Sequence, residues 1–308
     1  MPVLVCGNVV YDILARPVER IQYGATIPIE NVEQQMGGNA GTTSYTIAKL
    51  GVPVTLATLV GRDAACESVL GWLRAAGVDL SLVQHVDAPT SIAISLINAK
   101  AERALLYLLG AASEHFADFE IPAGCTHFHL AAVYRMRHLR TEAPRFLKAA
   151  REAGLRTSLD AQWDTEGAWM KVLAPSLPFT DFALLNEDEA LHLTGHSDPE
   201  NAARTLRDLG AGHIVIKLGP RGCWADGTYI PGHAVAALDT TGAGDCFSGG
   251  FVAALERGLS VVDAARFANG VGALAVQKVG ATAGVLDWDR TTKYLMTSGS
   301  KPVRSFCD

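Results

Sequence analysis

An acid directly behind a glycine-rich stretch is the feature of this sequence that most clearly points to chemistry. Residues 239–250 read Asp-Thr-Thr-Gly-Ala-Gly-Asp-Cys-Phe-Ser-Gly-Gly, so Asp245 follows Gly242, Ala243 and Gly244. Apolar residues then recur at helical spacing, which predicts that Gly242, Ala243 and Gly244 form the first turn of a helix. The first N–H groups of a helix lack intrahelical acceptors, so a backbone almost free of side chains lets an anion approach several donors there.

Asp245 has a different predicted role from the glycines. A carboxylate repels a neighbouring phosphoryl group, but it can accept the proton of an attacking hydroxyl while backbone amides stabilise the developing charge. We therefore expect hydroxyl phosphorylation, with Asp245 as general base. The alternative is a tightly packed loop with an acid at a favourable first-turn position. The acid, the glycines and the two threonines occur together, which favours the functional interpretation.

The composition restricts the class of protein. The 308 residues are 49% hydrophobic, carry a net charge of −6 and contain no apolar run long enough to cross a bilayer. This mild acidity argues against nucleic acid as a partner, and we expect no membrane partner either. The N-terminal residues Met-Pro-Val-Leu-Val-Cys-Gly resemble a first strand rather than a signal peptide, so a cytoplasmic location is expected.

The cysteines and the paired histidines give no sign of a metal site. The six cysteines are scattered without a Cys-x-x-Cys pair, which argues against a disulfide framework and against zinc. His127 and His129 alternate in a strand-like segment, but no carboxylate or cysteine cluster accompanies them. We expect them to serve packing or hydrogen bonding.

The elements that must position these residues alternate along the chain. Strands are expected over residues 3–10, 54–60, 127–133, 157–161, 182–186 and 213–218, and helices over 40–50, 66–76, 143–153, 201–209 and 261–276. This order predicts an α/β fold, a three-layer αβα sandwich with a mostly parallel central sheet. Without a repeat or linker, residues 1–308 are expected to form one domain, with 298–308 at its surface.

Two segments interrupt the alternation. Residues 14–35 and 90–110 are β-prone and contain no long amphipathic helix, so we expect them to pair into a small separate sheet. Such a sheet at the edge of the core could act as a lid that excludes water from phosphoryl transfer. Its apolar face is expected to meet a second subunit in a homodimer. The alternative is that both segments extend the main sheet.

Several motifs appear in the order seen in a known family. They are Gly37-Gly38-Asn39-Ala40-Gly41, Asn186-Glu187-Asp188-Glu189, Leu218-Gly219-Pro220-Arg221-Gly222 and the segment 239–250. In this respect the chain closely resembles the ribokinase-like, or PfkB-type, carbohydrate kinases over nearly its whole length. The resemblance implies ATP-dependent phosphorylation of a sugar or nucleoside hydroxyl, with Asp245 as base. No Gly-x-x-x-x-Gly-Lys-Ser/Thr loop is present, which disfavours a P-loop kinase.

The resemblance also implies metal sites. Asn186 and Glu189 match the residues that position Mg²⁺ and phosphates, largely through water, which agrees with the reluctance of Mg²⁺ to lose water. Taken alone, an Asn followed by acids after a strand is more often a helix cap. Asp239 and Thr241 match part of a K⁺ site that some relatives have. Because its other ligands are backbone carbonyls, the sequence leaves the presence of K⁺ open.

The resemblance places a nucleotide on one side of Asp245. Lys217, Gly219 and Gly222 match a loop beside the nucleotide, where small residues permit close approach and a lysine can meet phosphate charge. Asn269 lies where the family borders the adenine pocket. For all four residues, an ordinary strand-end turn or close helix packing is the alternative.

The acceptor is expected on the other side. Asp12 matches the acid that binds sugar hydroxyls, and Gly38 and Asn39 match a turn that contacts the substrate. Asp160-Ala161-Gln162-Trp163-Asp164 departs from the pattern of many relatives, which have Asp-x-Asn followed by Arg. Ribokinase itself usually has a lysine where Asn39 stands, so the sugar remains open.

Three other functions compete with a sugar kinase. A nucleoside kinase of the same family could stack a base on Tyr11, Phe116 or Trp163. A non-catalytic ligand sensor would keep the fold, but it would not need an acid at position 245. A dinucleotide-dependent dehydrogenase is disfavoured, because no Gly-x-Gly-x-x-Gly follows the first strand.

Overall fold

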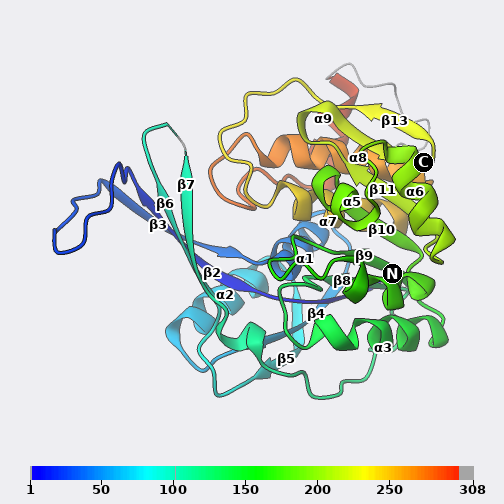
Figure 1. Ribbon diagram of the computed structural model, residues 1–308, viewed down its shortest axis with the longest axis horizontal. Helices are drawn as coiled ribbons and strands as arrows, with labels where there is room; N and C mark the ends of the chain where they lie inside the picture. Colours follow the sequence, from blue (N-terminus) through cyan, green and yellow to red (C-terminus); the bar gives the residue numbers. More distant parts are fainter. Residues whose placement is uncertain (1, 101, 298–308) are drawn as a thin grey trace.

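The protein has a large central sheet with helices on both faces (Figure 1). The computed structural model describes residues 2–100 and 102–297, so the expected surface position of 298–308 lies outside the described residues. The main sheet has nine strands in the order β13-β12-β11-β10-β9-β8-β1-β4-β5, and all neighbours from β11 to β5 pair in parallel. The predicted αβα architecture is therefore confirmed.

The strands of this sheet agree closely with the apolar runs in the sequence. They are β1 (Val3–Cys6), β4 (Val54–Val60), β5 (Asp79–His85), β8 (His127–Ala131), β9 (Arg156–Asp160), β10 (Phe182–Asn186), β11 (His213–Lys217), β12 (Gly222–Ala225) and β13 (Thr228–Pro231). Inner strands such as β4 are buried at every position, because helices cover both faces of a parallel sheet. The sequence analysis missed β5 and the antiparallel hairpin β12–β13, which lie at the two edges.

The helices form two layers, each with its own apolar cluster against one face of the sheet. Core residues on one face come from α1 (Asn39–Lys49), α2 (Ala64–Ala75), α7 (Ala243–Glu256), α8 (Val261–Ala275) and α9 (Trp288–Thr297). The other face is covered by α3 (Leu139–Glu152), α4 (Met170–Leu173), α5 (Glu187–Thr194) and α6 (Pro199–Asp208). Three short 3₁₀ helices complete the described chain: η1 (Gly110–Ser113), η2 (Ala174–Phe179) and η3 (Gly219–Arg221).

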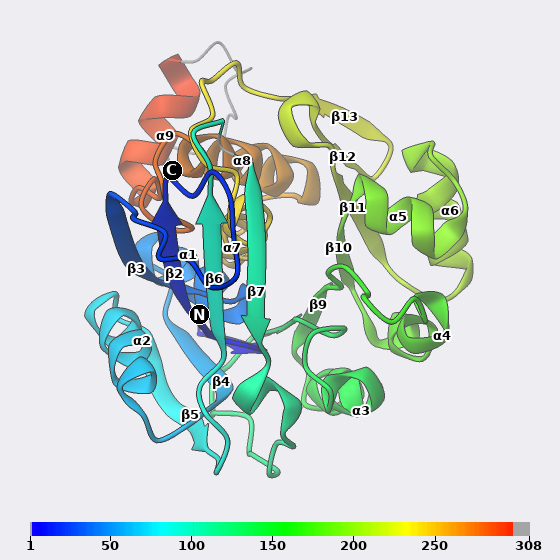
Figure 2. The ribbon, with the colours of Figure 1, turned by 60° about the vertical axis from the view of Figure 1, so that its left-hand side comes forward.

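A second, separate sheet of four strands stands beside this core (Figure 2). We call it the lid sheet; its order is β3 (Asn31–Gly37), β2 (Val10–Arg16), β6 (Ile92–Ile97) and β7 (Arg103–Leu108). The prediction of a separate sheet is thus confirmed, although the apolar run expected as one strand over 3–10 is divided. The chain leaves the main sheet after Cys6 and enters the lid sheet at Val10, so Asp12 lies within a lid strand rather than at the end of the first core strand.

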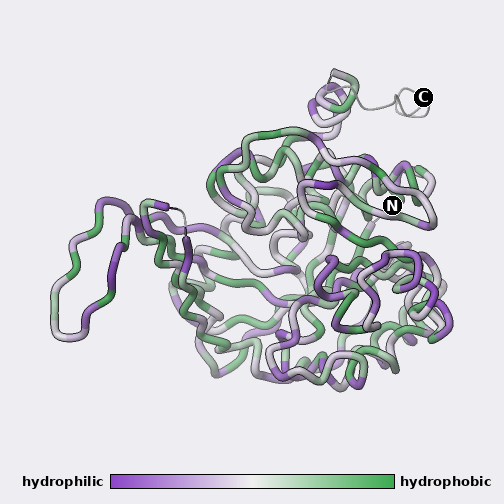
Figure 3. Tube along the Cα trace, turned by 45° about the horizontal axis from the view of Figure 1, so that its top comes forward, coloured by the Kyte–Doolittle hydropathy of each residue, from purple (hydrophilic) through white to green (hydrophobic). Residues whose placement is uncertain are grey.

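The connection between β2 and β3, residues 17–30, projects away from the body (Figure 3). Polar and apolar residues mix along it in Figure 3. Tyr23, midway along this segment, is 99% exposed. Within the described ranges, no helix is long and apolar enough to cross a membrane. The cytoplasmic location stays a prediction.

Candidate active site

The glycine-rich segment forms the start of α7. The helix begins at Ala243, one residue later than expected, and Gly242 precedes it as the N-cap residue with a left-handed φ of 70°. A Cβ on Gly242 would lie 2.7 Å from the Cβ of Ala281, so both the backbone conformation and the space require glycine. Ala243, Gly244 and Asp245 therefore form the first turn, where unpaired N–H groups favour an anion.

Two further glycines of the motif serve packing instead. A Cβ on Gly249 would lie 2.7 Å from the Cβ of Thr46 in α1, and one on Gly250 would lie 2.9 Å from Val271 in α8. Gly249 and Gly250 therefore allow α7 to approach both neighbouring helices closely, away from its N-terminus. The sequence analysis had counted them in support of an anion site, and the structure assigns them to helix packing.

Asp245 lies where α7 meets the start of α1. Its Oδ1 accepts a hydrogen bond from Asn39 Nδ2 at 2.8 Å, and its backbone carbonyl lies 3.3 Å from the donating Thr43 hydroxyl. Burial raises the pKa of Asp245 to about 7, assisted by the charge of Asp160, while Lys217 and the Asn39 bond act in the opposite direction. A carboxyl group with this pKa can exchange protons near neutral pH.

Lys217 and Asp160 form a buried ion pair beneath this turn. Lys217 Nζ donates to Asp160 Oδ2 at 2.7 Å, and the hydroxyl of Ser248 in α7 donates to the same oxygen at 2.7 Å. Lys217 Nζ would lie 3.5 Å from a Cβ on Gly244, so the ammonium sits directly below the helix N-terminus. Burial alone would lower the pKa of Lys217, but Asp160 and Glu189 raise it, so the lysine is charged.

Asn186 and Glu189 make the helix cap that was the alternative to a metal role. Glu189 N donates to Asn186 Oδ1 and Asn186 N donates to Glu189 Oε2, both at 2.8 Å, which forms a capping box at the start of α5. Glu189 nevertheless interacts electrostatically with the site, because burial and the charge of Asp160 raise its pKa to about 7. The capping role and a water-mediated metal role remain compatible, since each side chain keeps unused acceptor capacity.

Two cavities adjoin at the loop that precedes α7. The first, of about 300 Å³, is mostly apolar and includes Lys217, Gly219, Gly222 and Asn269 in its lining, together with Ala243 and Gly244. The structure thus brings together these four residues, which the resemblance assigned to the nucleotide. Gly222 is required by the hairpin, since a Cβ there would lie 2.0 Å from the carbonyl oxygen of Ile230. Asn269 Nδ2 donates to the carbonyl of Pro231 at 2.8 Å.

The second cavity, of about 380 Å³, lies between the lid sheet and residues 237–241. Asp12 lines it from the lid, and Asp239 and Thr241 line it from the core. Burial raises the pKa of Asp12 to about 7, while the nearby Arg103 lowers it. Ala237 and Thr240 line both cavities, so the 237–241 loop separates them. Gly38 lies at the edge of this region, where a Cβ would meet the backbone of residues 8–10 at 2.7–2.8 Å.

The side-chain groups expected to bind K⁺ are already occupied. Asp239 accepts hydrogen bonds from Thr241 N on one oxygen and from Gly280 N on the other, both at 2.9 Å. The Thr241 hydroxyl accepts one from Arg103 at 2.7 Å, and the carbonyl of Val276 accepts from Leu238 N and Asp239 N. This geometry lends no support to K⁺, which stays an unsupported prediction.

The charges of the residues at the predicted Mg²⁺ site show whether that site suits a cation. Asp160, Glu189 and Asp245 influence one another electrostatically, and Lys217 is the nearby positive charge that opposes them. This excess of negative charge fits a bound cation. Among the described residues, no group of three or more His, Cys, Asp or Glu is arranged to ligate a metal directly. The residues therefore fit Mg²⁺ held through water and phosphate oxygens.

The three aromatic residues considered for stacking a base lie elsewhere. Tyr11 stacks on Trp72 of α2 with ring centroids 5.8 Å apart, and Phe116 is buried in a cluster with Phe146. Trp163 packs edge-on against Trp169, 4.9 Å away, and lines neither cavity. Tyr11 and Phe116 pack against other aromatic residues, and Trp163 is 45% exposed, but none of the three lines either cavity, so the structure does not place them to stack a base there.

The sequence analysis missed several polar residues that the fold brings to the site. They are Asn8, Gln35, Arg103, Tyr107 and Arg135. Asn8 Oδ1 accepts from Asn39 N at 3.2 Å, while Asn8 Nδ2 donates to the Tyr107 hydroxyl at 3.3 Å. Asn8 follows the first strand, where polar residues could have been noticed. The lid residues gave no such signal, because their proximity depends on strand pairing.

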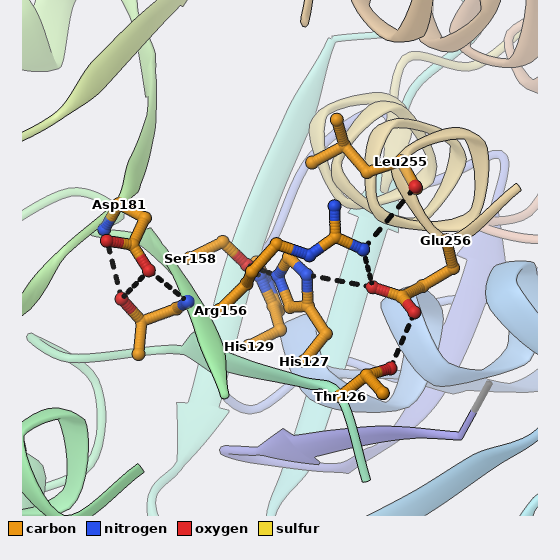
Figure 4. Close-up of polar contacts among 9 residues, drawn as sticks. Thr126, His127, His129, Arg156, Ser158, Asp181, Leu255 and Glu256 are labelled. Carbon is orange, nitrogen blue, oxygen red and sulfur yellow. Dashed lines mark hydrogen bonds and ion pairs between the residues drawn. The ribbon is translucent and has the colours of Figure 1, made fainter. Parts of the chain in front are cut away.

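His127 and His129 belong to a polar cluster toward the amino ends of the central strands β8 and β9 (Figure 4). The hydroxyl of Ser158 lies 2.7 Å from His127 Nε2 and 2.7 Å from His129 Nδ1. Glu256 accepts from Thr126 at 2.7 Å and from Arg156 at 2.5 Å, and its Oε1 lies 3.3 Å from His127 Nδ1. The expectation that these two histidines serve hydrogen bonding is confirmed.

An acid behind a glycine-capped helix N-terminus, between two adjoining cavities of an αβα sandwich, is the arrangement of a phosphotransferase with a backbone anion site. Comparison with known proteins gives the family. A match to "pfkB family carbohydrate kinase" spans residues 3–288, and the chain belongs to that family. Its members are phosphotransferases that act on sugar hydroxyls, so this chain is a kinase-class enzyme.

Individual relatives agree with this assignment. The chain is 25% identical to a ribokinase of Staphylococcus aureus over 299 residues, which cover 92% of this chain and 96% of that protein. It is also 25% identical to a nucleoside kinase of Methanothermobacter thermautotrophicus over 298 residues, 94% of each chain. A crystal structure of a putative ribokinase II from E. coli, in complex with ATP and Mg²⁺, has the same fold, with a TM-score of 0.84, 23% identity and coverage of 96% and 98%.

Proposed function

We propose that this protein phosphorylates a hydroxyl group of a sugar with ATP, and that Asp245 is the general base. The observation that carries the proposal is the position of Asp245. Its carboxylate is oriented by Asn39 at 2.8 Å, it follows the N-terminus of α7 directly, and its pKa is raised to about 7. A base of this pKa can take a hydroxyl proton at neutral pH.

The residues around Asp245 divide the work of the reaction. Asp12 accepts hydrogen bonds from hydroxyls of the acceptor and holds it in the cavity beneath the lid sheet. The N–H groups of the first turn, from Ala243 to Asp245, face the developing negative charge. Lys217 lies below that turn and contributes a positive charge next to the phosphates. Proton removal and charge stabilisation therefore occur at the two ends of one short segment.

The nucleotide occupies the apolar cavity between Gly222 and Asn269. Its adenine is bordered by Asn269, and its phosphates point toward Gly244 and Lys217. When bound, Mg²⁺ neutralises charge on the phosphate oxygens, and Asn186 and Glu189 hold it through water. In this arrangement, the excess negative charge of Asp160, Glu189 and Asp245 attracts the cation.

The lid sheet closes over the acceptor and carries a homodimer interface. Its side away from the cavity is apolar: Ile13, Ile94 and Leu106 are cross-strand neighbours, and Leu106 is 56% exposed. Leu108 on the same side is 47% exposed. A second copy of the chain would cover this surface. Replacement of Leu106 and Leu108 by Asp should convert a dimer to a monomer in light scattering, and an unchanged mass would contradict the interface.

A panel of sugars and nucleosides, assayed by ADP production with ATP and Mg²⁺, tests the function. Turnover of a sugar that disappears in the Asp245→Asn variant is the expected result. Turnover that survives this substitution at near wild-type rate would refute the role of Asp245.

Two alternatives give different results in the same panel. A preference for a nucleoside over every sugar would identify a nucleoside kinase, in which Tyr107 is the aromatic residue on the cavity side of the lid sheet. Sugar binding in calorimetry without any ATP consumption would indicate a sensor. A partly buried acid with a raised pKa at this position favours turnover over sensing.

A further inference from the structure

The side of the lid sheet that faces the acceptor cavity has an ordered set of side chains. Alternate residues of a strand share a face, and strand register shows which of them are neighbours. Counted from the end of β2 nearest the core, two successive rows are Asp12, Ala93 and Tyr107, then Leu14, Ser95 and Leu105; Ile97 and Arg103 form the next pair, and Arg16 lies two residues beyond Leu14 on the same face. Polar hydroxyl-binding groups are thus at one end of the face and two guanidinium groups at the other.

Both arginines share the 380 Å³ cavity with Asp12. Arg16 follows Asp12 by four positions along β2, about 13 Å at strand spacing, and the Arg103 side chain extends back toward Asp12 and Thr241. A sugar of five to seven carbons held at Asp12 would therefore reach the guanidinium of Arg103 with its far end.

Arg103 has most of its hydrogen-bonding capacity unused. Among the described residues it makes one hydrogen bond, from Nη1 to the Thr241 hydroxyl, and no ion pair, although a guanidinium has five N–H donors. Two acids near it make other contacts: both oxygens of Asp239 accept backbone N–H groups, and Glu33 pairs with Arg16. Asp12 lines the same cavity, where burial raises its pKa and the charge of Arg103 lowers it, but these two described residues form no ion pair.

A second donor in the cavity also lacks a partner. The Nε2 of Gln35, which lines the cavity beside Asp12, is buried and forms no hydrogen bond with the described residues. Buried donors are normally satisfied, so the cavity has the donors for an acceptor-rich ligand. Gln35 can donate to a neutral or a charged oxygen, so the preference for negatively charged oxygen atoms rests on Arg103.

We propose that the acceptor is an anionic sugar, with a carboxylate or phosphate group bound by Arg103 while Asp12 binds its hydroxyls. The proposal rests on the sugar kinase function above and specifies its substrate class. The planar guanidinium fork matches the oxygens of both groups, and a charge-assisted bond of this kind is stronger than one to a neutral hydroxyl. A neutral sugar would leave Arg103 with only Thr241.

The test compares matched acceptors in the same enzyme. Aldoses, the aldonic acids derived from them and their terminal phosphate esters are assayed by ADP production, in the wild type and in Arg103→Met. We expect the wild type to prefer one anionic class over its neutral counterpart, and Arg103→Met to lower that preference about 10- to 100-fold, the equivalent of one or two charged hydrogen bonds. The aldonate and phosphate series show which anion is bound.

Arg20→Met is the matched control, since Arg20 is an exposed arginine in the 17–30 loop outside the cavity lining. It should leave the ratio of anionic to neutral turnover unchanged. If Arg103 only fastened the lid to Thr241, its loss would slow all acceptors equally and the ratio would not move. An unchanged ratio in Arg103→Met, or a neutral sugar as the best substrate, would overturn the proposal and leave the kinase function intact.

Calorimetric titration with the same acceptors separates the two proposals. Anionic sugars that bind tightly to the wild type and weakly to Arg103→Met, without any ADP production, would refute the kinase function and support the anion site. Equal binding of charged and neutral sugars in both proteins would refute the anion site.

Discussion

The two ends of helix α7 carry acids in opposite states. Glu256, its last residue, has its carboxylate surrounded by Thr126, Arg156 and His127. Burial would raise the pKa of Glu256, but these partners hold it at about 2. Asp245, in the first turn of the same helix, has one side-chain hydrogen bond, from Asn39, and a pKa of about 7. One helix thus presents a fully paired acid and an incompletely paired one.

The two acids have different roles: Glu256 stabilises the fold, whereas Asp245 is available for the proposed reaction. An acid at a helix C-terminus is opposed by the helix dipole, so Glu256 requires strong partners, and it then fixes α7 to the sheet. An acid at the N-terminus is favoured by the dipole and could have been stabilised further, yet Asp245 has a second carboxylate, Asp160, in its surroundings. Because it is incompletely paired, the Asp245 carboxylate can still accept a proton and, in the proposed reaction, contact the acceptor hydroxyl.

The largest expected effect is the loss of activity on substitution of Asp245, the incompletely paired acid of α7. Asp245→Asn should lower kcat about 10²- to 10⁴-fold, because the loss of a general base costs this much. The stability of the fold should not decrease, since a carboxyl whose folded pKa is raised destabilises the folded state when ionised. Steady-state kinetics and thermal unfolding at pH 8 measure both, and Asp289→Asn, an exposed acid in α9, is the control. A variant that loses activity only because it unfolds would contradict the assignment.

Substitution of Glu256, at the C-terminal end of α7, should reduce stability and leave activity nearly unchanged. Glu256→Ala should lower the free energy of unfolding by about 2–4 kcal/mol, because the buried His127 and the partly buried Thr126 lose their partner, while kcat of the folded enzyme changes little. Denaturant unfolding measures this loss. Glu152→Ala, at the last residue of α3, replaces an exposed acid and should cost little.

The pH dependence of this stability has a definite sign. The folded pKa of Glu256 is depressed, so its contribution is present above the unfolded value of 4.5 and is lost as pH falls toward 2. The difference between wild type and Glu256→Ala should shrink over that range. A difference independent of pH would mean that packing, not charge, accounts for the effect.

The Lys217–Asp160 pair should affect both stability and activity, since it is buried like Glu256 but lies beside the N-terminus of α7, near Asp245. Lys217→Met should raise KM for ATP about 10- to 50-fold, as expected for a lost charge contact with phosphate. It also leaves Asp160 without its cation and should destabilise the fold. The double variant with Asp160→Asn removes both charges and should recover stability without recovering the KM. Lys148→Met, an exposed lysine of α3, is the control, and recovery of both properties would refute a phosphate contact.

The smallest expected effect concerns the pH profile. In wild type, kcat/KM should fall below about pH 7, because Asp245 and Asp12 both take up protons there. Asn39→Ala removes a hydrogen bond that stabilises the ionised form of Asp245, so the pKa rises and the acid limb moves up by about one unit or less. A limb that stays in place or moves down would show that Asn39 does not act on Asp245.

The sequence predicted the core of the fold well but the surroundings of the site less well. Apolar runs such as 54–60 and 182–186 coincide with strands because burial on both faces selects every residue in them. The strand expected over 3–10 was divided, since an apolar pattern does not show where a strand changes sheets. Strand β5 was missed because it lies at an edge and is largely exposed.

Within the site, residues on a local motif were easier to predict than residues brought in by pairing. Gly242 and Asp245 are determined by a single helix start. Arg103 reaches Thr241 only because β6 and β7 pair in one register, which the sequence does not show. Asp160 was noticed as part of an unusual motif, but its bond with Lys217 depends on β9 and β11 both flanking β10.

The path between the lid sheet and the proposed base is very short. Strand β3 ends at Gly37, Gly38 follows with a φ of 83°, and Asn39 begins α1 and donates to Asp245. A rotation of the lid about these two glycines would act directly on the amide that holds the carboxylate. Any such movement would reach the base through three consecutive residues and one hydrogen bond, without a relay through the core.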